Sequence, residues 1–206
     1  MAARAGRRRG APTAGEQARE AIVVAAVACL ADGGFSTTSA RAVADRAGIA
    51  PGGVFYHFGS MDDLLGVVFE RCLDARLDRL GTVLEAPTDQ LPEALRAAVA
   101  DEFAHPESRA LLELVVGAAG SPVLAERVRT GIERSFEFTR RVVDRLVAGS
   151  PLAHVLPLDL VAQIAASAFF GLAVLDLVGT PVDIDGMTAL VGALTRLGAP
   201  ATDPAR

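Results

Sequence analysis

The chain has 206 residues, of which 51% are hydrophobic and 22% charged, so it is long enough for one or two domains with a real core and too apolar to be mostly disordered. Its formal net charge of −5 argues against a uniformly basic nucleic-acid-binding protein. The charge is unevenly distributed, however: residues 1–60 carry seven arginines against four acidic residues, and residues 61–206 carry thirteen against twenty-one. This asymmetry predicts two parts with different tasks.

The cysteines and the apolar segments indicate a cytoplasmic protein without a membrane partner. Cys29 and Cys72 are too few and too far apart for a disulfide framework or a zinc cluster, so both are expected to be reduced core thiols. The N-terminus lacks an apolar segment with a cleavage site, and no signal peptide is expected. Residues 160–179 nearly reach the length of a membrane span, but Gln163 and Asp176 would then lie in lipid. A helix buried between protein surfaces is therefore preferred.

Taken in chain order, the sequence begins with a segment rich in arginine, glycine and alanine. Residues 1–15 are predicted to form a flexible basic arm. A first helix is expected over residues 16–32, because its apolar periodicity stops at a pair of glycines. A second helix of about nine residues is expected to start after a threonine cap, at Thr37 or Thr38, and to end at a glycine.

The remaining elements are also predicted to be helices. A third is expected over residues 51–58, with Pro51 at its first position, where a missing N–H has no cost. Ser60 is expected to cap a fourth helix, whose first turn carries two aspartates that favour the helix dipole. Periodicity and proline or glycine boundaries predict further helices near residues 90–104, 106–119, 122–148, 157–178 and 184–197. No β-pattern of convincing length interrupts them, so the predicted fold is all-α.

Two short helices joined by a tight glycine-containing turn, after a longer helix, are typical of a helix-turn-helix. In that motif the second short helix, here GGVFYHF, enters the major groove, and its two glycines would leave room for the DNA backbone. Val54 and Phe58, four residues apart, are expected to face the core, while Phe55, Tyr56 and His57 cover the remaining arc. Tyr56 and His57 can donate hydrogen bonds to phosphate oxygens or base edges.

Residues 16–63 resemble the DNA-binding domain of the TetR family of transcriptional regulators. The resemblance is carried by GGFSTTSARAVADRAGIAPGGVFYHFGSMDDLL, which has the glycine-aromatic turn, the Thr-Ser cap, the Ala-Gly-Ile turn and the His-Phe end of the recognition helix. It implies that the DNA contacts lie on and just before the two short helices. The matching positions are Thr38, Ser39, Arg41, Gly52, Gly53, Phe55, Tyr56 and His57.

The sequence departs from the family pattern at three positions. Pro51 and Met61 stand where relatives often carry a basic residue, Phe55 stands where they often carry tyrosine, and the chain contains no lysine. Each change removes a phosphate contact, unless another cation replaces it. Arginines of the arm could do so by following the backbone or entering the minor groove, namely Arg4, Arg7, Arg8 and Arg9. The alternatives are that the arm is only solvated, that His57 fills space under the first helix, and that Phe55 only packs.

Residues 64–206 look like the family's variable helical domain, in which relatives dimerise and bind an effector. The helices at 158–178 and 184–197 would pair with their symmetry mates, which accounts for the long apolar segment. An effector pocket is expected between the fourth helix and the helices near 90–148. Its candidate lining residues are Phe103, His105, Arg109, Glu113, Phe136, Phe138, Phe169 and Phe170. Glu113, if buried, would need a cationic ligand or Arg109 as its partner.

The sequence carries no pattern of a catalytic, cofactor-binding or metal site. The three histidines lack metal-ligand spacing, and neither a phosphate-binding glycine fingerprint nor a nucleophile motif is present. We therefore expect no metal, no cofactor and no enzymatic activity. The prediction is a homodimeric regulator, a repressor that an unidentified small molecule releases from palindromic double-stranded operator DNA. The alternative is a helical interaction or ligand-binding protein that keeps the fold without binding an operator.

Overall fold

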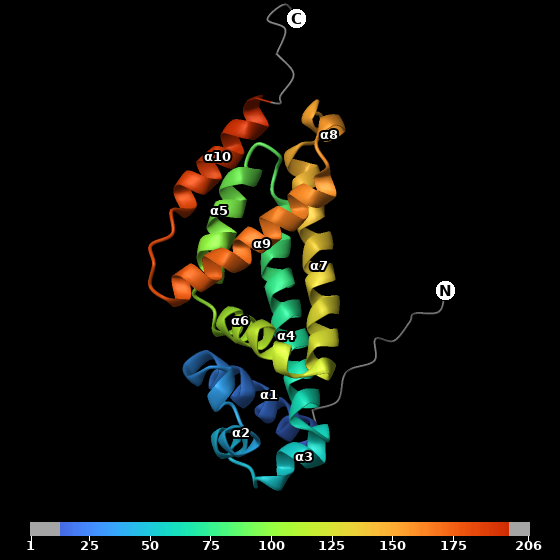
Figure 1. Cartoon of the computed structure of the whole chain (residues 1–206), viewed down its shortest axis with the longest axis vertical. Helices are drawn as coiled ribbons and strands as arrows, with labels where there is room; N and C mark the ends of the chain where they lie inside the picture. The colour runs from blue at the N-terminus through green and yellow to red at the C-terminus, as the bar shows by residue number, and fades with distance from the viewer. Residues whose placement is uncertain (1–12, 198–206) are drawn as a thin grey trace, which may run out of the picture.

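The computed structural model describes residues 13–197, with side chains through Ala193. Helices joined by short turns make up this part of the chain, as the sequence predicts, and no strand occurs within it (Figure 1). Of the predicted arm, residues 1–12, with the four arginines, lie outside the described residues. Its last two residues, Ala14 and Gly15, instead begin the first helix, because Thr13 and Glu16 form a capping box there. The α-helices are α1 (Ala14–Gly33), α2 (Ala40–Ala47), α3 (Gly52–Phe58), α4 (Met61–Gly81), α5 (Leu91–Glu102), α6 (Pro106–Gly117), α7 (Pro122–Leu146), α8 (Leu152–Val155), α9 (Leu158–Leu177) and α10 (Ile184–Leu197). Three 3₁₀ turns connect them, η1 (Phe35–Thr37), η2 (Thr82–Glu85) and η3 (Ala118–Gly120).

The start of α2 differs from the prediction. Ser39, and not a threonine, is its N-cap, and the Ser39 hydroxyl accepts a hydrogen bond from the backbone N–H of Ala42 at 3.2 Å. Thr37 and Thr38 instead donate their hydroxyl hydrogens to carbonyl oxygens at the end of α1, over 2.8 and 2.9 Å. The reason is the turn η1, which the sequence analysis did not anticipate and which places the threonines against α1.

Helix α3 begins at Gly52, with Pro51 at its N-cap position and not as its first residue as predicted. Two other predicted helix ends near it are confirmed. Gly48 closes α2 in the left-handed conformation, with φ of +68°, which is why a glycine is needed there. Ser60 caps α4: its hydroxyl accepts from the backbone N–H of Asp63 at 3.0 Å and donates to the Asp63 carboxylate at 2.6 Å. These caps fix the two short helices between α1 and α4.

The helices are arranged in two groups joined by α4 and α7. Figure 1 shows α1, α2 and α3 gathered at one end, and α5, α8, α9 and α10 at the other. Helices α4 and α7 run side by side between them, α9 packs across α7, and α10 packs against α5. Helix α4 is thus common to both ends of the molecule.

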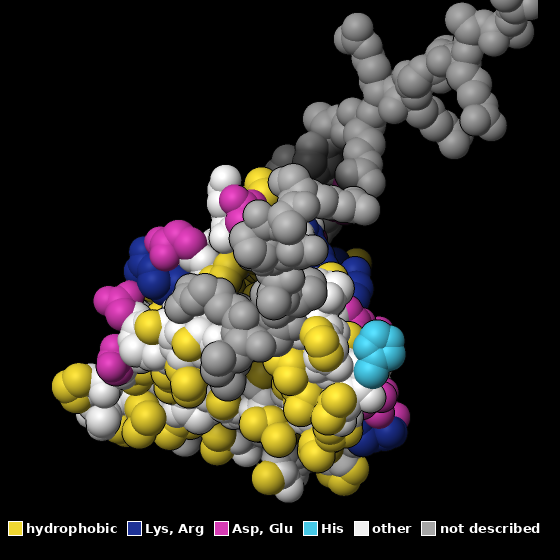
Figure 2. Space-filling model, turned by 90° about the horizontal axis from the view of Figure 1, so that it is seen from above, with side chains coloured by type: hydrophobic (Ala, Val, Ile, Leu, Met, Phe, Trp, Pro, Cys, Tyr) yellow, Lys and Arg dark blue, Asp and Glu magenta, His cyan; other side chains and the backbone are white. Residues whose placement is uncertain are grey.

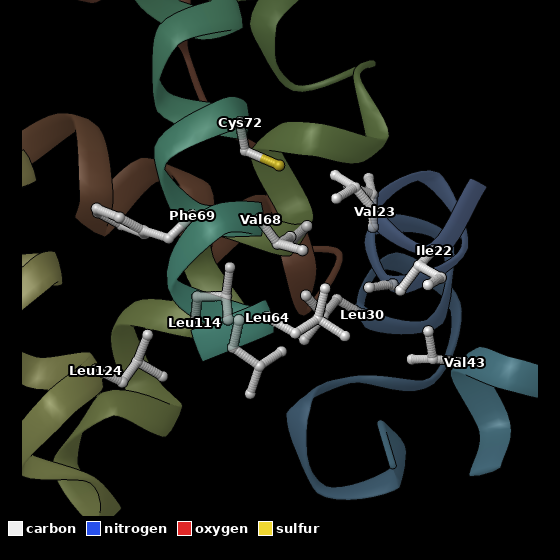
Figure 3. Packing of buried hydrophobic residues seen from close by; sticks show 14 of the residues in the cluster. Ile22, Val23, Leu30, Val43, Leu64, Val68, Phe69, Cys72, Leu114 and Leu124 are labelled. Carbon is white, nitrogen blue, oxygen red and sulfur yellow. The ribbon is translucent and has the colours of Figure 1, made fainter. Parts of the chain in front are cut away.

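One buried core continues from the first group into the second. Figure 3 shows residues of α1 and α2 pointing toward α4, where they meet residues of α6 and α7. Leu64 and Val68 of α4 are fully buried in this cluster, as are Ile22 of α1 and Leu114 of α6. The division between domains at residue 63 remains a prediction, and in the structure the N-terminal half of α4 shares the core of α1 to α3.

Both cysteines are free thiols. Cys72 of α4 is fully buried, and burial raises the pKa of its thiol to about 12, so the thiol stays protonated at neutral pH.

Candidate DNA-binding and ligand-binding sites

The helix-turn-helix is held by buried residues on one face of each short helix. Val43 and Ala44 of α2 and Val54 of α3 are fully buried, and Phe58 is nearly so, which confirms the predicted inward face of α3. Arg19 of α1 adds a second link, because its guanidinium lies 4.1 Å from the centre of the Phe58 ring. It also donates a hydrogen bond of 2.6 Å to the carbonyl oxygen of the preceding residue in α3.

The outer face of α3 is available to a partner. Tyr56 is 85% exposed, Phe55 is exposed and His57 is partly exposed, so Phe55 is not a core residue. The Tyr56 and His57 rings meet edge to face with their centres 5.0 Å apart. On α2, Arg41 is exposed and lies 3.9 Å from Asp45, an exposed pair that leaves the guanidinium accessible.

The two glycines that begin α3 differ in their surroundings. A Cβ atom at Gly52 would meet nothing within 4 Å, so this position is open to the close approach of another molecule. A Cβ atom at Gly53 would lie 2.8 Å from the Cδ1 atom of Ile49. A side chain at Gly53 would therefore require the end of the Ile49 side chain, in the turn before α3, to shift.

A cavity of about 400 Å³ lies at the other end of the molecule, among α4, α5, α7, α9 and α10. Its lining is almost entirely apolar and includes Leu77, Leu80, Val99 and Val142. A smaller cavity of about 150 Å³ lies beside it. The size and apolar walls of the larger cavity are those of a small-molecule site.

The predicted pocket residues divide into three groups. Phe138, Phe169 and Phe170 line the larger cavity, and Phe169 and Phe170 also line the smaller one. Phe103 and Arg109 line only the smaller cavity. The three that line neither cavity are His105, Glu113 and Phe136.

Each of these three residues has another environment. His105 lies 3.1 Å from the carboxylate of Asp101, one helical turn earlier in the chain. Phe136 lies two residues before Phe138 on α7, which places it on the opposite side of that helix. Glu113, which was expected to pair with a ligand or with Arg109, accepts a hydrogen bond of 2.7 Å from the backbone N–H of Phe35.

A buried charge cluster beside both cavities was missed by the sequence analysis. Glu102, the last residue of α5, is 1% exposed and accepts two hydrogen bonds of 3.0 Å from the Arg79 guanidinium. It also accepts one from the hydroxyl of Ser108. Arg76 of α4 lies 3.8 Å from the same carboxylate and lines both cavities. Its spacing from Phe69 and Leu80 on the buried stripe of α4 was the signal that could have revealed it.

Comparison with known proteins identifies the fold and the class of regulator. Residues 22–68 match the family model of bacterial regulatory proteins, tetR family. The HTH-type transcriptional repressor Rv3405c of Mycobacterium tuberculosis is 38% identical over 160 residues, which cover 74% of this chain and 75% of that protein. The HTH-type transcriptional regulator Mb3439c of Mycobacterium bovis matches to the same extent.

The chain belongs to the TetR family. Among solved structures, a transcriptional regulator of Rhodococcus sp. Rha1 superposes with a TM-score of 0.70 at 23% identity, covering 90% of this chain and 99% of that one. The multidrug binding protein EbrR, solved in complex with imidazole, superposes with a TM-score of 0.63 at 19% identity and covers 91% and 98% of the two chains. The predictions of an all-α TetR-like fold and of a DNA-binding transcriptional regulator are confirmed.

In this TetR-family regulator, the DNA-binding end is attached to α6 through the turn η1. The hydrogen bond from Phe35 to Glu113 joins η1 to the middle of α6. A Cβ atom at Gly117, at the end of α6, would collide with the Phe35 ring, so the glycine lets this ring lie against the helix. The other end of α6 carries Ser108, which is bonded to Glu102. Helix α6 therefore contacts both the helix-turn-helix and the charge cluster at the cavities.

Replacement of Tyr56 tests whether the exposed face of α3 contacts DNA in this TetR-family regulator. We expect Tyr56→Ala to weaken operator binding by about 1–3 kcal/mol, because the phenol is a hydrogen-bond donor on the open face of α3. The melting temperature should barely move, since the side chain is exposed. Fluorescence anisotropy with an operator selected from random DNA measures the first quantity. Val155→Ala, an exposed residue of α8, serves as the control. Unchanged affinity of the Tyr56 variant would show that another surface reads the DNA.

Proposed function

We propose that the protein is a homodimeric repressor that a largely apolar small molecule releases from a palindromic operator, and that it acts in the cytoplasm. The observation that carries the proposal is the apolar cavity of about 400 Å³. It lies along the same helix, α4, that packs into the core of the DNA-binding end. The naming of the M. tuberculosis relative as a repressor supports this direction of regulation.

Helices α4 and α6 offer a physical route from ligand to DNA. Leu80 of α4 lines the cavity, and Leu64, four turns earlier, is buried among α1 to α3. A ligand that displaces α4 would therefore shift the DNA-binding end. In a dimer this alters the distance between the two recognition helices, which must match half-sites about 34–36 Å apart or a multiple of that. That the related EbrR was solved with imidazole bound supports a ligand-binding role for this fold.

The dimer is proposed to form through α9 and α10. An exposed stripe runs along α9 through Leu160, Ile164, Gly171 and Val174, at the spacing of one helical face, and continues to the C-cap residue Val178. Seen from the end of the molecule near α8 and α10, hydrophobic side chains gather along one side (lower part of Figure 2). A Cβ atom at Gly171 would meet nothing within 4 Å in a single chain, so a second helix can approach closely there. An apolar face of this kind is typical of a protein interface.

The same stripe explains the hydropathy of α9. Among the described residues, Leu158–Leu177 is the one helix long and apolar enough to cross a membrane by length and composition, with a mean hydropathy of 1.9. Most of it is exposed in a single chain. We propose that a second copy of the chain, and not lipid, covers it.

Operator binding and release test the proposal directly. DNA selected from a random pool should contain a palindrome, and the selected fragment should give a salt-dependent shift in a gel with the full-length protein. A protein with no preference over random DNA would instead support the alternative of a helical ligand-binding protein that has lost operator binding. Small molecules that bind the cavity should then lower the fraction of shifted operator.

The part of the predicted arm that precedes α1, residues 1–12, is proposed to supply phosphate contacts. Within residues 13–60, three arginines face four acidic residues, so the positive charge of the first 60 residues comes entirely from Arg4, Arg7, Arg8 and Arg9. Deletion of residues 2–10 should make the slope of log affinity against log salt shallower by about two to three, because each phosphate neutralised contributes about 0.9. The ranking of operator variants should be nearly intact. A slope equal to that of the full chain would mean that the arm does not touch DNA.

A further inference from the structure

Arg76 occupies an unusual position between the two cavities. Its side chain is buried, with the whole residue 8% exposed, and it lines both the larger and the smaller cavity. The guanidinium carbon lies 4.2 Å from the centre of the Phe169 ring and 5.3 Å from that of Phe170. Within the described part of the chain, the guanidinium makes no hydrogen bond. Its five N–H donors therefore lack a hydrogen-bond acceptor among the described residues. No fully buried polar side-chain atom is left unbonded there, so these donors keep accessible surface where Arg76 lines the cavities.

The nearest carboxylate does not form a hydrogen bond with Arg76. Glu102 is 3.8 Å from the Arg76 Nε atom, too far for a hydrogen bond, and its oxygens already accept from Arg79 and Ser108. Two arginines thus share one carboxylate, which leaves the cluster with one net positive charge. Burial lowers the pKa of Arg76 to about 10, so the group is still charged at neutral pH. Arg76 thus has an ion-pair partner at 3.8 Å but no hydrogen bond, and a largely buried charge without hydrogen bonds is costly.

The other polar side chains that line the larger cavity, as far as residue 193, have no free donor. Besides Arg76, its lining contains Ser135, Thr139 and Thr188. Each of these three hydroxyls donates to a carbonyl oxygen of its own helix, over 3.0, 2.9 and 2.8 Å. Among the side chains that the structure describes, a ligand in this cavity would meet apolar walls and one polar anchor, Arg76.

We propose that the cavity binds an amphipathic monocarboxylate, with its carboxylate on Arg76 and its hydrocarbon body in the 400 Å³ space. This proposal rests on the proposed ligand-binding role of the cavity and names the class of its ligand. The planar guanidinium matches a carboxylate through paired hydrogen bonds. A ligand with one negative charge neutralises the net positive charge of Arg76, Arg79 and Glu102. A phosphate dianion would leave the same group with a net negative charge. A cationic ligand is disfavoured, because the oxygens of Glu102 are already occupied.

Calorimetric titration of the full-length, DNA-free protein with three probes of equal chain length tests the proposal. The probes are decanoate, decanol and decylamine, each used below its aggregation concentration. Wild-type protein should bind decanoate about ten- to a hundredfold more tightly than decanol, because only the acid forms charge-assisted hydrogen bonds. Decylamine should bind most weakly. Equal binding of acid and alcohol, preference for the amine, or no binding of decanoate would overturn the proposal.

Two variants of Arg76 and one control variant test whether Arg76 causes the preference for decanoate over decanol. Arg76→Gln should lose the advantage of decanoate over decanol and keep the binding of decanol within about twofold. Arg134→Gln, an exposed arginine of α7 paired with Asp74, should retain the wild-type preference. If Arg76→Gln fails to fold, Arg76→Lys, which keeps the charge, must still prefer the acid. A Gln variant that folds and retains the preference would show that Arg76 is not the anchor.

A separate operator-release assay distinguishes this proposal from the proposed function. Decanoate that binds through Arg76 without releasing DNA would leave the ligand class intact and reject the regulatory role of the cavity. Release by decanol and decanoate at equal concentrations would keep the regulatory role and reject the carboxylate anchor.

Discussion

Ile164→Arg should convert the protein from a dimer into a monomer that no longer binds its operator measurably at the concentration that saturates the wild type. Ile164 is 61% exposed in a single chain and lies in the apolar stripe of α9. In a two-fold symmetric interface the substitution occurs twice, so it places two arginines in one apolar contact. Burial of charge without a partner costs several kcal/mol per group, which such an interface cannot offset. Sedimentation at micromolar concentration measures the change of mass.

A matched substitution on another face provides the control. Val116 of α6 is as exposed as Ile164, and Val116→Arg should remain a dimer with normal operator affinity. Persistence of the dimer in Ile164→Arg would place the interface elsewhere. A wild-type protein that sediments as a monomer, or that partitions into membranes, would reject the pairing of α9 and α10 altogether.

The helix-turn-helix was largely predictable because its determinants are local. Gly48 needs its left-handed conformation whatever surrounds it, Ser60 caps the helix that it precedes, and Val54 and Phe58 share a face by helical periodicity. The cap of α2 was misassigned because Thr37, Thr38 and Ser39 all have the chemistry of a cap. Only the 3₁₀ turn at the end of α1 decides among them, and three adjacent hydroxyl residues give no sequence signal for it.

The cavity was less predictable because its lining depends on tertiary packing. Phe138, Phe169 and Phe170 were expected there as large apolar residues, and geometry places them at the cavity. Arg76 and Glu102 were not considered, because charged residues on amphipathic helices are normally solvated. Glu102 is buried because α5 packs against α4, a tertiary contact that no local pattern specifies, whereas the spacing of Arg76 from Phe69 and Leu80 could have placed it in the core.

For Glu113 the apolar surroundings were predictable from the sequence, but the hydrogen-bond partner was not. Its apolar neighbours in the sequence correctly indicated an acidic group away from bulk water, and it is partly buried. Its partner could not be inferred, because it is a backbone N–H 78 residues earlier in the chain. A carboxylate in an apolar stretch of sequence can thus accept its hydrogen bond from a distant turn of the same protein and need no ligand.

Glu102→Gln should lower the free energy of unfolding by about 3–5 kcal/mol, the cost typical of removing one partner from a buried ion pair. The substitution keeps the shape of the side chain and changes its charge only. Arg79 and Arg76 would then face each other with two positive charges and no carboxylate between them. Urea unfolding at fixed dimer concentration should show a lower midpoint with an unchanged slope.

Glu93→Gln is the matched control, since Glu93 lies on the same helix, α5, and pairs with Arg96 at the surface, where its side chain is 69% exposed. Its unfolding midpoint should stay close to that of the wild type, because exposed ion pairs contribute little. Arg76→Gln combined with Glu102→Gln should recover part of the lost stability, since it removes one of the two repelling charges. A Glu102 variant as stable as the Glu93 control would mean that Arg79, which is one-quarter exposed, can turn its charge into solvent. Arg76 would then be the only cation that lines the larger cavity among the described side chains, and the anchor for a carboxylate would not depend on the cluster.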